Sequence, residues 1–357
     1  MFARERRDDN PLGRHFALCF PGRLSDELEG TSADVHWMGA VRLSRPWTVL
    51  AARWRLKALL DGGNYDLVLC HAMWPLLVFG PAVRKAGLPL CVWAHDVADR
   101  VHWIERWAVR TKPDLVISNS RFTMEHWARF HPNIACKVQY YPVPPPEHGD
   151  PTEIRAHKRR ELQTGDGDVV ILIAARFEPL KGHRVLLQAL AALKDRPNWR
   201  CWVAGGAQRD HEKDTVDELK RLAHELQVAD RIQWLGARSD VFELMLAADI
   251  YCQPNIAEES FGVVFVEAMH ARLAVVTTAM GGPQEFIDSE SGILTRAGDA
   301  AQVADALRNL IEDPALRLRL GTHAKEQALR LFDFDTNLKL LDQTLRQVIS
   351  DHRRSRS

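Results

Sequence analysis

The chain has 357 residues, more than one ordinary hydrophobic core organises, so we expect two domains. It carries 47 Lys and Arg against 47 Asp and Glu, and this zero net charge argues against a nucleic-acid-binding protein, which is normally strongly basic. No apolar run is long enough for a transmembrane helix, and the first residues lack the apolar core of a secretion signal. Six cysteines without a CxxC pair indicate buried thiols in a reducing compartment, so we expect a cytoplasmic protein.

Short apolar strands alternate with helices through the first half of the chain. The expected strands are 15–22, 33–38, 66–71, 89–96, 114–120 and 137–143. The expected helices between them are 24–29, 46–61, 74–86, 99–110 and 121–130. This alternation is typical of a parallel, doubly wound sheet with helices on both faces, so the fold class is α/β.

Residues 142–168 are rich in proline, glycine and charge, and we place the domain boundary in this segment. After it the alternation resumes, with expected strands at 168–177, 199–206, 231–236 and 249–255. Expected helices follow at 183–195, 211–227, 240–249, 300–312, 314–330 and 335–350. The predicted domains are residues 1–145 and 146–335, followed at 336–357 by a terminal helix and a disordered basic tail, DHRRSRS.

Two glutamates mark the segment 250–296. Glu259 lies in an expected loop, and Glu267, eight positions later, lies inside an apolar helix. A carboxylate in such surroundings needs hydrogen-bond donors or a cation facing it. At about 1.5 Å per helical residue the two acids are about 10 Å apart, which suits an elongated polyhydroxylated ligand held at two points. From the spacing alone, a surface glutamate and a structural ion pair explain the pattern equally well.

Two cations occur in the segment AARFEPLKG at 174–182. Arg176 follows a buried strand, and Lys181 precedes a helix. Two cations at a helix N-terminus form a natural site for a diphosphate. Taken alone, the motif is also compatible with two ordinary loop residues.

Several expected strands end on polar or flexible residues. His71 and His95 end two strands of the first half, and Gly236 to Arg238 form a turn after a strand of the second. Doubly wound sheets bind their ligands at the carboxyl ends of the strands. Structural histidines and a tight turn are the alternatives at these positions.

Neither Asp-x-Asp pair is placed to hold a divalent ion on a diphosphate. Asp166 and Asp168 precede a strand, and Asp333 and Asp335 open a helix as a cap. We therefore expect no metal and no cofactor, with Arg176 and Lys181 supplying the positive charge.

The spacing Glu-x7-Glu, with FG after the first glutamate, EAM at the second and GGPQE at 281–285, resembles the retaining glycosyltransferases of family 4. The resemblance covers roughly residues 15–345. It implies the GT-B fold, in which two Rossmann-like domains face a cleft, with the last helix crossing back to the first domain. It further implies that a nucleotide-diphosphate-sugar donor binds the second domain. A hexosyl group would then pass to a hydroxyl of a sugar, polysaccharide or lipid-linked acceptor, in glycan, polysaccharide or glycolipid biosynthesis.

The family resemblance also implies roles for the donor-side residues. Arg176 and Lys181 would neutralise the leaving diphosphate. Glu267 would accept from the ribose hydroxyls, and Glu259 would contact sugar hydroxyls as one of two catalytic candidates. Backbone groups would cradle the sugar and phosphate at Phe261, Gly262 and Val263.

The remaining roles that the resemblance implies belong to residues at the ends of expected strands. His95, followed by Asp96 in an HD pair, matches the family histidine that faces the donor sugar and is the second catalytic candidate. His71 would line the acceptor side. The turn with Gly236 and Arg238 would contact the nucleotide base.

One departure from the family pattern concerns the first domain. Family members open with a strand and a glycine-rich loop, whereas HFALCFPGRL at 15–24 matches what usually comes second. We therefore expect a gap at a central strand of the first sheet. Because of this departure, a non-catalytic nucleotide-sugar-binding protein is an alternative function. A sugar phosphorylase or sugar-phosphate synthase of the same fold is another. Eight tryptophans among the first 130 residues also suggest peripheral contact with the inner face of the membrane.

Overall fold

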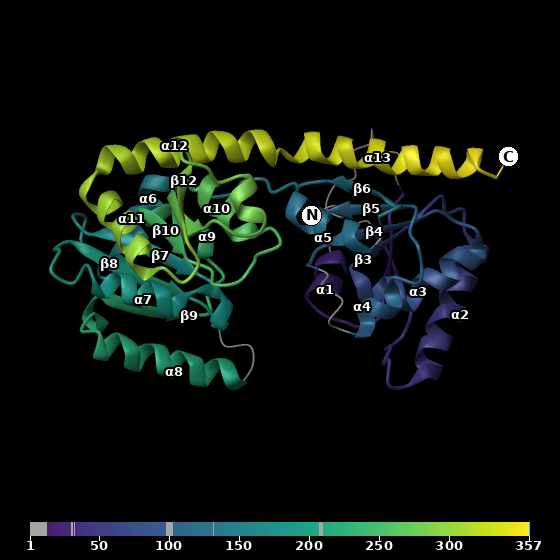
Figure 1. Ribbon diagram of the computed structural model, residues 1–357, viewed down its shortest axis with the longest axis horizontal. Coiled ribbons are helices and arrows are strands. Elements are labelled where there is room, and N and C mark those ends of the chain that lie inside the picture. The colour runs from purple at the N-terminus through teal and green to yellow at the C-terminus, as the bar shows by residue number, and fades with distance from the viewer. Residues whose placement is uncertain are drawn as a thin grey trace. The chain divides into compact units, whose positions relative to one another are not determined.

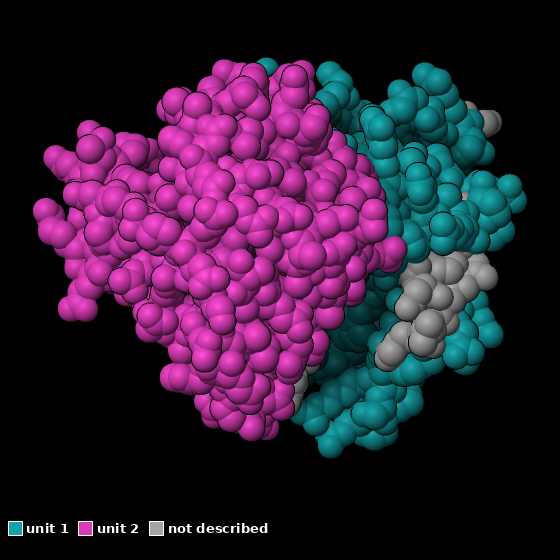
Figure 2. Space-filling model, turned by 60° about the vertical axis from the view of Figure 1, so that its left-hand side comes forward, with its two compact units in different colours: residues 1–142, 334–357 teal, residues 143–333 magenta. Residues whose placement is uncertain are grey.

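The computed structural model describes residues 13–29, 31, 33–97, 103–130, 132–206 and 210–356. The chain forms two compact units (Figure 2). Unit 1 comprises residues 1–142 and 334–357, and unit 2 comprises residues 143–333. Both units are built on parallel sheets with helices, which confirms the predicted α/β class. Part of the predicted helix 99–110 lies outside the described residues.

Unit 2 is built on a six-stranded parallel sheet with the order β12-β11-β10-β7-β8-β9. Its strands are β7 (Val169–Ala174), β8 (Trp199–Ala204), β9 (Ile232–Gly236), β10 (Ile250–Gln253), β11 (Ala274–Thr278) and β12 (Gly292–Thr295). The central strands read as continuous apolar runs, VVILIA in β7 and AVVTT in β11. Such runs are expected where helices cover both faces of a parallel sheet.

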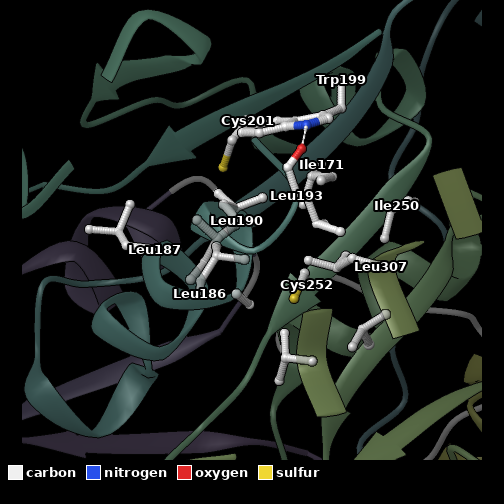
Figure 3. Packing of buried hydrophobic residues seen from close by; sticks show 14 of the residues in the cluster. Ile171, Leu186, Leu187, Leu190, Leu193, Trp199, Cys201, Ile250, Cys252 and Leu307 are labelled. Carbon is white, nitrogen blue, oxygen red and sulfur yellow. Dashed lines mark hydrogen bonds between the residues drawn. The ribbon is translucent and has the colours of Figure 1, made fainter. Parts of the chain in front are cut away.

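Helices cover both faces of this sheet. They are α6 (Pro151–Glu161), α7 (His183–Ala191), α8 (Asp210–Glu225), α9 (Val241–Ala247), α10 (Val263–His270), α11 (Ala300–Glu312) and α12 (Pro314–Leu331). Three short 3-10 turns accompany them: η1 (Pro179–Lys181), η2 (Ala229–Arg231) and η3 (Gly282–Glu285). The main core lies between the sheet and the helices α7, α8 and α11 (Figure 3). Ile171 and Ile250 from the strands meet Leu186 and Leu307 from the helices there.

Helix α6 lies within residues 142–168, a segment whose composition indicates only a domain boundary. Asp150 caps it by accepting hydrogen bonds from the backbone N–H groups of Thr152 and Glu153, and Pro151 occupies its first turn. Two of its cations, Lys158 and Arg159, are buried: Arg159 is 2% exposed and donates to Asp249 at 2.6 Å. The charged composition hides this helix because its buried face is held by ion pairs rather than by apolar side chains.

Replacing Arg159 by methionine is expected to lower the free energy of unfolding by about 3 kcal/mol, because it leaves the Asp249 carboxylate short of a partner in a buried site. The Arg159 guanidinium also donates to the carbonyls of Ala247 and Gly165, which would lose their donor. Urea denaturation measures the change. The matched control is Arg160→Met, an exposed neighbour expected to change stability by less than about 0.5 kcal/mol. Equal effects of the two substitutions would contradict a stabilising role for the Arg159 contacts.

Unit 1 contains two parallel sheets among its described residues. One pairs β1 (His15–Leu18) with β2 (Asp34–Trp37), and the other has the order β3-β4-β5-β6. The second sheet contains β3 (Val68–His71), β4 (Leu90–Ala94), β5 (Leu115–Ser118) and β6 (Ala135–Val138). This division of the strands into two sheets agrees with the predicted gap at a central strand.

The helices of unit 1 are α1 (Arg23–Glu29), α2 (Pro46–Gly62), α3 (Met73–Ala86), α4 (Trp103–Ala108), α5 (Arg121–Phe130) and α13 (Phe334–Arg354). Strand β4 shows how they cover the four-stranded sheet (Figure 1). Its residues Val92 and Ala94 belong to the core formed with α2 and α3, whereas Cys91 and Trp93 pack with Leu341 of α13 on the other face.

The predicted disordered tail is wrong. Helix α13 continues to Arg354, and the described chain runs to Arg356. Arg353 donates to the Asp66 carboxylate at 2.6 Å, while His352 Nε2 and Arg356 both contact the carbonyl of Gly87. The basic residues are therefore ordered by partners in the first part of unit 1, which the local composition does not reveal.

Candidate functional site

The sheet of unit 2 changes direction beside β7. The chain runs outward from β7 to β8 and β9 and then places β10 on the other side of β7. Strands β7 and β10 are therefore neighbours, and the loops that follow them lead the chain to opposite faces of the sheet. Ligands of doubly wound sheets bind at such a switch point. Arg176 and Lys181 follow β7 and Glu259 follows β10, so the fold brings three predicted site residues to one edge of the sheet.

An ion pair joins these two loops across the switch point. Lys181 Nζ donates to Glu259 Oε2 at 2.5 Å, and the two side chains are only 14% and 19% exposed. Gly182, between η1 and α7, has φ +75°, and a Cβ there would lie 1.8 Å from the carbonyl oxygen of Pro254. Glycine is therefore required for the two loops to approach closely enough to form the pair. Arg176 is more open, at 48% exposed, and pairs with Glu178 at 2.5 Å.

The GGPQE turn supports the Glu259 loop. Gly282 N–H donates to the carbonyl of Glu259 at 2.8 Å. A Cβ on Gly281, which has φ +65°, would lie 2.2 Å from that same carbonyl oxygen. These two glycines therefore allow the turn to approach the backbone of the Glu259 loop closely. The turn continues as η3, which ends on Glu285.

The start of α10 completes this edge of unit 2. Phe261 is 1% exposed and packs against Phe286 and Phe332 with ring centroids 5.3 and 5.7 Å away, so its side chain fixes the loop from within. Gly262 has φ +81°, and α10 begins at Val263. The first N–H groups of a helix have no partner within it, so this start is suited to hold an anionic or polyhydroxylated group.

Glu267 is half-buried on α10, and burial raises the pKa of its carboxyl group. Burial also raises the pKa of Tyr251, and the negative charges of Glu267 and Glu259 add to this effect, so both carboxylates lie near that phenol. The Tyr251 hydroxyl, however, contacts Gln253 Oε1 at 2.7 Å. Within the described part of the chain no residue donates a hydrogen bond to Glu267 or pairs with it, so the donors that its surroundings call for do not come from these residues. Hydroxyl groups of a ligand would satisfy this carboxylate.

The ends of β7, β8 and β9 also meet at this edge. Gly205 N–H donates to the carbonyl of Gly236 at 2.8 Å, and a Cβ on Gly205 would lie 2.2 Å from the carbonyl oxygen of Ala175. Arg238 has other partners, because its guanidinium donates to Asp240 at 2.6 Å and to Glu161 at 2.8 Å. The side chain of Arg238 is thereby tied to α6, and the backbone at Gly236 remains the open part of the predicted base loop.

Unit 1 brings its two predicted histidines together at the carboxyl edge of the four-stranded sheet. The rings of His71 and His95 stack with centroids 5.1 Å apart, and His71 Nδ1 lies 2.8 Å from His95 Nε2. His95 Nδ1 lies 2.5 Å from the hydroxyl of Tyr141. Asn119 donates both to that hydroxyl, at 3.1 Å, and to the carbonyl of His95, at 3.0 Å. We call these four residues the histidine stack.

Burial lowers the pKa of His95 to about 4, so its ring is neutral at pH 7 and offers one donor and one acceptor nitrogen. Ala72, directly after His71, has φ +77°, a conformation that non-glycine residues rarely adopt and that is common at functional sites. Tyr141 and Asn119 were not identified from the sequence. Their common signal is that each follows a strand of the same sheet, at the edge where the two histidines lie.

Removing the Tyr141 hydroxyl is expected to change the tautomer of His95. The Tyr141 oxygen accepts from Asn119, so its proton is directed to His95 Nδ1, which favours a proton on Nε2 of His95. In Tyr141→Phe we expect a mixture of tautomers, measured from the ring ¹⁵N chemical shifts. Tyr65→Phe, in the same unit but outside the histidine stack, is the control. An unchanged His95 spectrum in Tyr141→Phe would contradict this arrangement.

No group of three or more His, Cys, Asp or Glu side chains with metal-site geometry occurs in the residues that the structure describes. Asp166 and Asp168 precede β7, at the opposite end of the strand from Lys181, and Asp168 accepts from the N–H of Gly165. Asp333 precedes α13. Metal independence stays a prediction.

Comparison with known proteins identifies the family. Sequence models of two families match: Glycosyl transferases group 1 over residues 154–327 and Glycosyltransferase Family 4 over residues 14–144. The D-inositol 3-phosphate glycosyltransferase of Actinosynnema mirum is 30% identical over 310 residues, which cover 80% of this chain and 73% of that protein. The chain therefore belongs to the family 4, group 1 glycosyltransferases, as the sequence motifs predict.

Other relatives match over different shares of their length. The GDP-mannose-dependent alpha-(1-6)-phosphatidylinositol monomannoside mannosyltransferase of Mycolicibacterium smegmatis is 27% identical over 77% of this chain and 75% of its own length. The D-inositol 3-phosphate glycosyltransferase of Corynebacterium glutamicum is 36% identical, but the match spans only 48% of this chain and 41% of that protein.

Solved structures confirm the GT-B fold. HepE of Anabaena, crystallised with UDP and glucose, superposes with a TM-score of 0.79 at 26% identity, over 93% of this chain and 91% of that one. A glycosyltransferase of Rickettsia africae reaches a TM-score of 0.82 at 21% identity, over 92% of this chain and 88% of that one. This second likeness concerns the fold alone.

Proposed function

We propose that the protein is a retaining, metal-independent glycosyltransferase that moves a hexosyl group from a nucleotide-diphosphate-sugar to an acceptor hydroxyl. The observation that carries the proposal is the Lys181–Glu259 pair at the switch point of unit 2. Lys181 would supply a cation for the diphosphate and Glu259 a carboxylate for sugar hydroxyls. The two side chains lie in contact at the edge where doubly wound sheets bind their ligands.

The diphosphate would be held by Lys181 and Arg176. An ammonium group has three donors, so Lys181 can keep its hydrogen bond to Glu259 and still donate to a phosphate oxygen. Arg176, which is nearly half-exposed, can turn from Glu178 toward the ligand. Two positive charges stabilise a leaving nucleoside diphosphate as its negative charge develops, which is the role that a metal ion would otherwise fill.

The two glutamates would hold hydroxyl groups on either side of the diphosphate. Glu267 has no hydrogen-bond donor among the described residues and would accept from the ribose hydroxyls. Glu259 would orient the donor sugar, and the backbone at Phe261, Gly262 and Val263 would contact its hydroxyls and phosphate. Unit 1 would bind the acceptor. In it we assign His95 to the reacting sugar and His71 to the acceptor, and Tyr141 and Asn119 would fix the His95 ring.

The transfer would proceed by attack on the same face that the diphosphate leaves. The bond from the anomeric carbon to the phosphate oxygen breaks, the bond to the acceptor oxygen forms, and the acceptor proton passes to an oxygen of the departing diphosphate. The oxocarbenium-like transition state carries positive charge on the sugar ring and negative charge on the diphosphate, so Lys181 and Arg176 lower its energy.

The names of relatives support a nucleotide-sugar donor. HepE has been crystallised with UDP-glucose, and the mycobacterial relative is named for its use of GDP-mannose. We extend this to a UDP-, GDP- or ADP-sugar here, with a sugar, polysaccharide or lipid-linked acceptor in glycan, polysaccharide or glycolipid synthesis. No helix among the described residues combines the length and the apolar character needed to cross a bilayer. The six cysteines form no disulfide, as is typical of proteins in a reducing compartment, so we assign the protein to the cytoplasm.

The stereochemistry of the product tests this mechanism. The protein would be incubated with α-linked UDP-, GDP- and ADP-sugars and a sugar acceptor in EDTA, and the new linkage read by NMR from the coupling of its anomeric proton. An α-linked product formed in EDTA is the expected result. A β-linked product would exclude the retaining mechanism, and activity that requires an added divalent ion would exclude the metal-independent one.

A non-catalytic nucleotide-sugar-binding protein is the second candidate. The division of unit 1 into the β1–β2 and β3–β6 sheets favours it, because a sheet with a gap offers a less rigid acceptor side. Donor binding with neither transfer nor hydrolysis, for every donor and acceptor tried, would support this candidate over the transferase.

A further inference from the structure

Helix α2 of unit 1 exposes the three most open large hydrophobic side chains among the described residues. Trp47 is 65%, Leu50 63% and Trp54 71% exposed. Positions separated by three and seven residues fall on the same face of a helix, so these side chains form one outward stripe. We call Trp47, Leu50 and Trp54 the α2 stripe. It leaves two indole rings in water, an unfavourable state for a folded protein without a partner.

The opposite face of α2 is occupied by the core. Ala52, Leu56 and Leu60 are buried against the neighbouring elements, and α2 packs on α3 (Figure 1). The helix is therefore apolar on two opposite faces, whereas a surface helix of a globular protein usually has one apolar face. The side chains of the α2 stripe therefore do not contribute to the core of unit 1.

Unpaired cations lie beside the α2 stripe. Between Asp34 and Asp61 the chain has no acidic residue, although acidic and basic residues are equal in number over the whole chain. The same stretch carries five cations: Arg42, Arg45, Arg53, Arg55 and Lys57. Arg53 donates inward to the carbonyls of Leu77 and Val78, and Lys57 pairs with Asp61. Arg42, Arg45 and Arg55 are exposed, and no described acidic residue pairs with them, although Arg55 also donates to the carbonyl of Met38 at 2.7 Å. Arg42 and Arg45 precede Trp47 at the start of α2, and Arg55 lies on one flank of the stripe.

We propose that the α2 stripe and its flanking cations dock the protein on an anionic phospholipid surface. Tryptophan prefers the boundary between head groups and acyl chains, and a helix lying there buries its apolar face by about 5–10 Å. Exposed arginines and lysines beside it attract anionic head groups. The helix would lie in the plane of the interface, held to the rest of unit 1 by its buried face.

A second copy of the chain is the less suitable occupant. Two identical surfaces meeting about a two-fold axis would place the α2 stripe against itself. Arg42, Arg45 and Arg55 of both copies would then face each other, and no described acidic residue pairs with them, so these like-charge contacts would be costly. An anionic lipid surface complements both the apolar stripe and its charge.

Vesicle binding by the full chain tests the proposal without any need for activity. The protein would be sedimented with vesicles of phosphatidylcholine alone and with an equal mixture of phosphatidylcholine and phosphatidylglycerol. The test variant is Trp47→Ser with Trp54→Ser. The matched control is Leu318→Ser with Leu329→Ser on α12, which removes two side chains that are 58% and 48% exposed in unit 2. All four side chains are open to solvent, so thermal unfolding should be unchanged in both variants.

We expect binding to the mixed vesicles, with the partition coefficient lowered about tenfold or more in the tryptophan variant and unchanged in the control. Binding of the native protein should weaken when the salt concentration rises from about 0.1 to about 0.5 M. The proposal is overturned if the native protein does not bind the mixed vesicles, or if the two variants bind alike. It is also overturned if, without vesicles, the native protein is a dimer that the tryptophan variant converts to a monomer, because the stripe would then be a contact between copies.

Discussion

Replacing Lys181 by alanine is expected to lower kcat/KM for sugar transfer by about 10²–10³-fold. Lys181 is the less exposed of the two cations proposed for the diphosphate, and its ammonium lies 2.5 Å from Glu259 at the switch point. A charge aimed at the developing negative charge of a leaving group is worth this much when it is removed. The loss should be larger in kcat than in the affinity for the intact donor, because the charge on the diphosphate grows as the bond breaks. Steady-state kinetics with varied donor measure both.

The matched control for this substitution is Lys194→Ala. Lys194 lies in the same unit, and its ammonium is exposed and contacts Gln227 at 3.2 Å. Its loss should change kcat/KM less than about twofold, as expected for a solvated surface lysine. If Lys181→Ala lost less than about tenfold in kcat/KM, the diphosphate would not depend on this cation and the proposed site would be misplaced.

Replacing Glu267 by glutamine is expected to change binding and stability in opposite directions. The ionised carboxylate would accept from two ribose hydroxyls, and losing charged hydrogen bonds should weaken nucleotide binding about 100-fold. The free energy of unfolding at pH 7 should rise, because no described residue donates to Glu267 and burial disfavours its charge. Titration with the nucleotide and urea denaturation measure the two effects. Glu258→Gln, an exposed neighbour, should change neither.

The pH dependence of stability follows from the same carboxyl group. Burial raises the pKa of Glu267 in the folded protein, so the folded state holds this proton at a higher pH than the unfolded chain does. Glu267 therefore lowers stability as the pH rises through the folded pKa, and glutamine removes this penalty. A glutamine variant that is less stable than the native protein above that pH would mean that the carboxylate has a protein partner.

Most of the secondary structure was predicted because its signals are local. The strand β7 is a bare apolar run, and α12 begins after Asp313, which caps it, with a proline in its first turn. Helix α6 was missed because its buried cations are satisfied by Asp240 and Asp249, about 80–90 residues further along the chain. The end of α13 was missed for the same reason, since its partners Asp66 and Gly87 lie in the first part of unit 1.

The candidate site was predicted residue by residue but not as an arrangement. The motifs identify Lys181 and Glu259 separately, whereas their contact depends on the strand order, which places β10 beside β7. For Glu267 the apolar surroundings predict a need for donors, yet the sequence does not reveal whether protein or ligand supplies them. Tyr141 and Asn119 carry no motif, and only the meeting of strand ends in unit 1 connects them with His95.

Binding of free nucleoside diphosphates tests most directly whether the carboxyl edge of unit 2 is a nucleotide-sugar site. The native protein, Lys181→Ala and Glu267→Gln would be titrated with UDP, GDP and ADP in EDTA, with Lys194→Ala and Glu258→Gln as controls. We predict saturable binding of at least one of them to the native protein and to both controls, and strongly weakened binding to the two site variants. If no nucleotide bound, or if the site variants bound as the native protein does, the proposed donor site would be refuted.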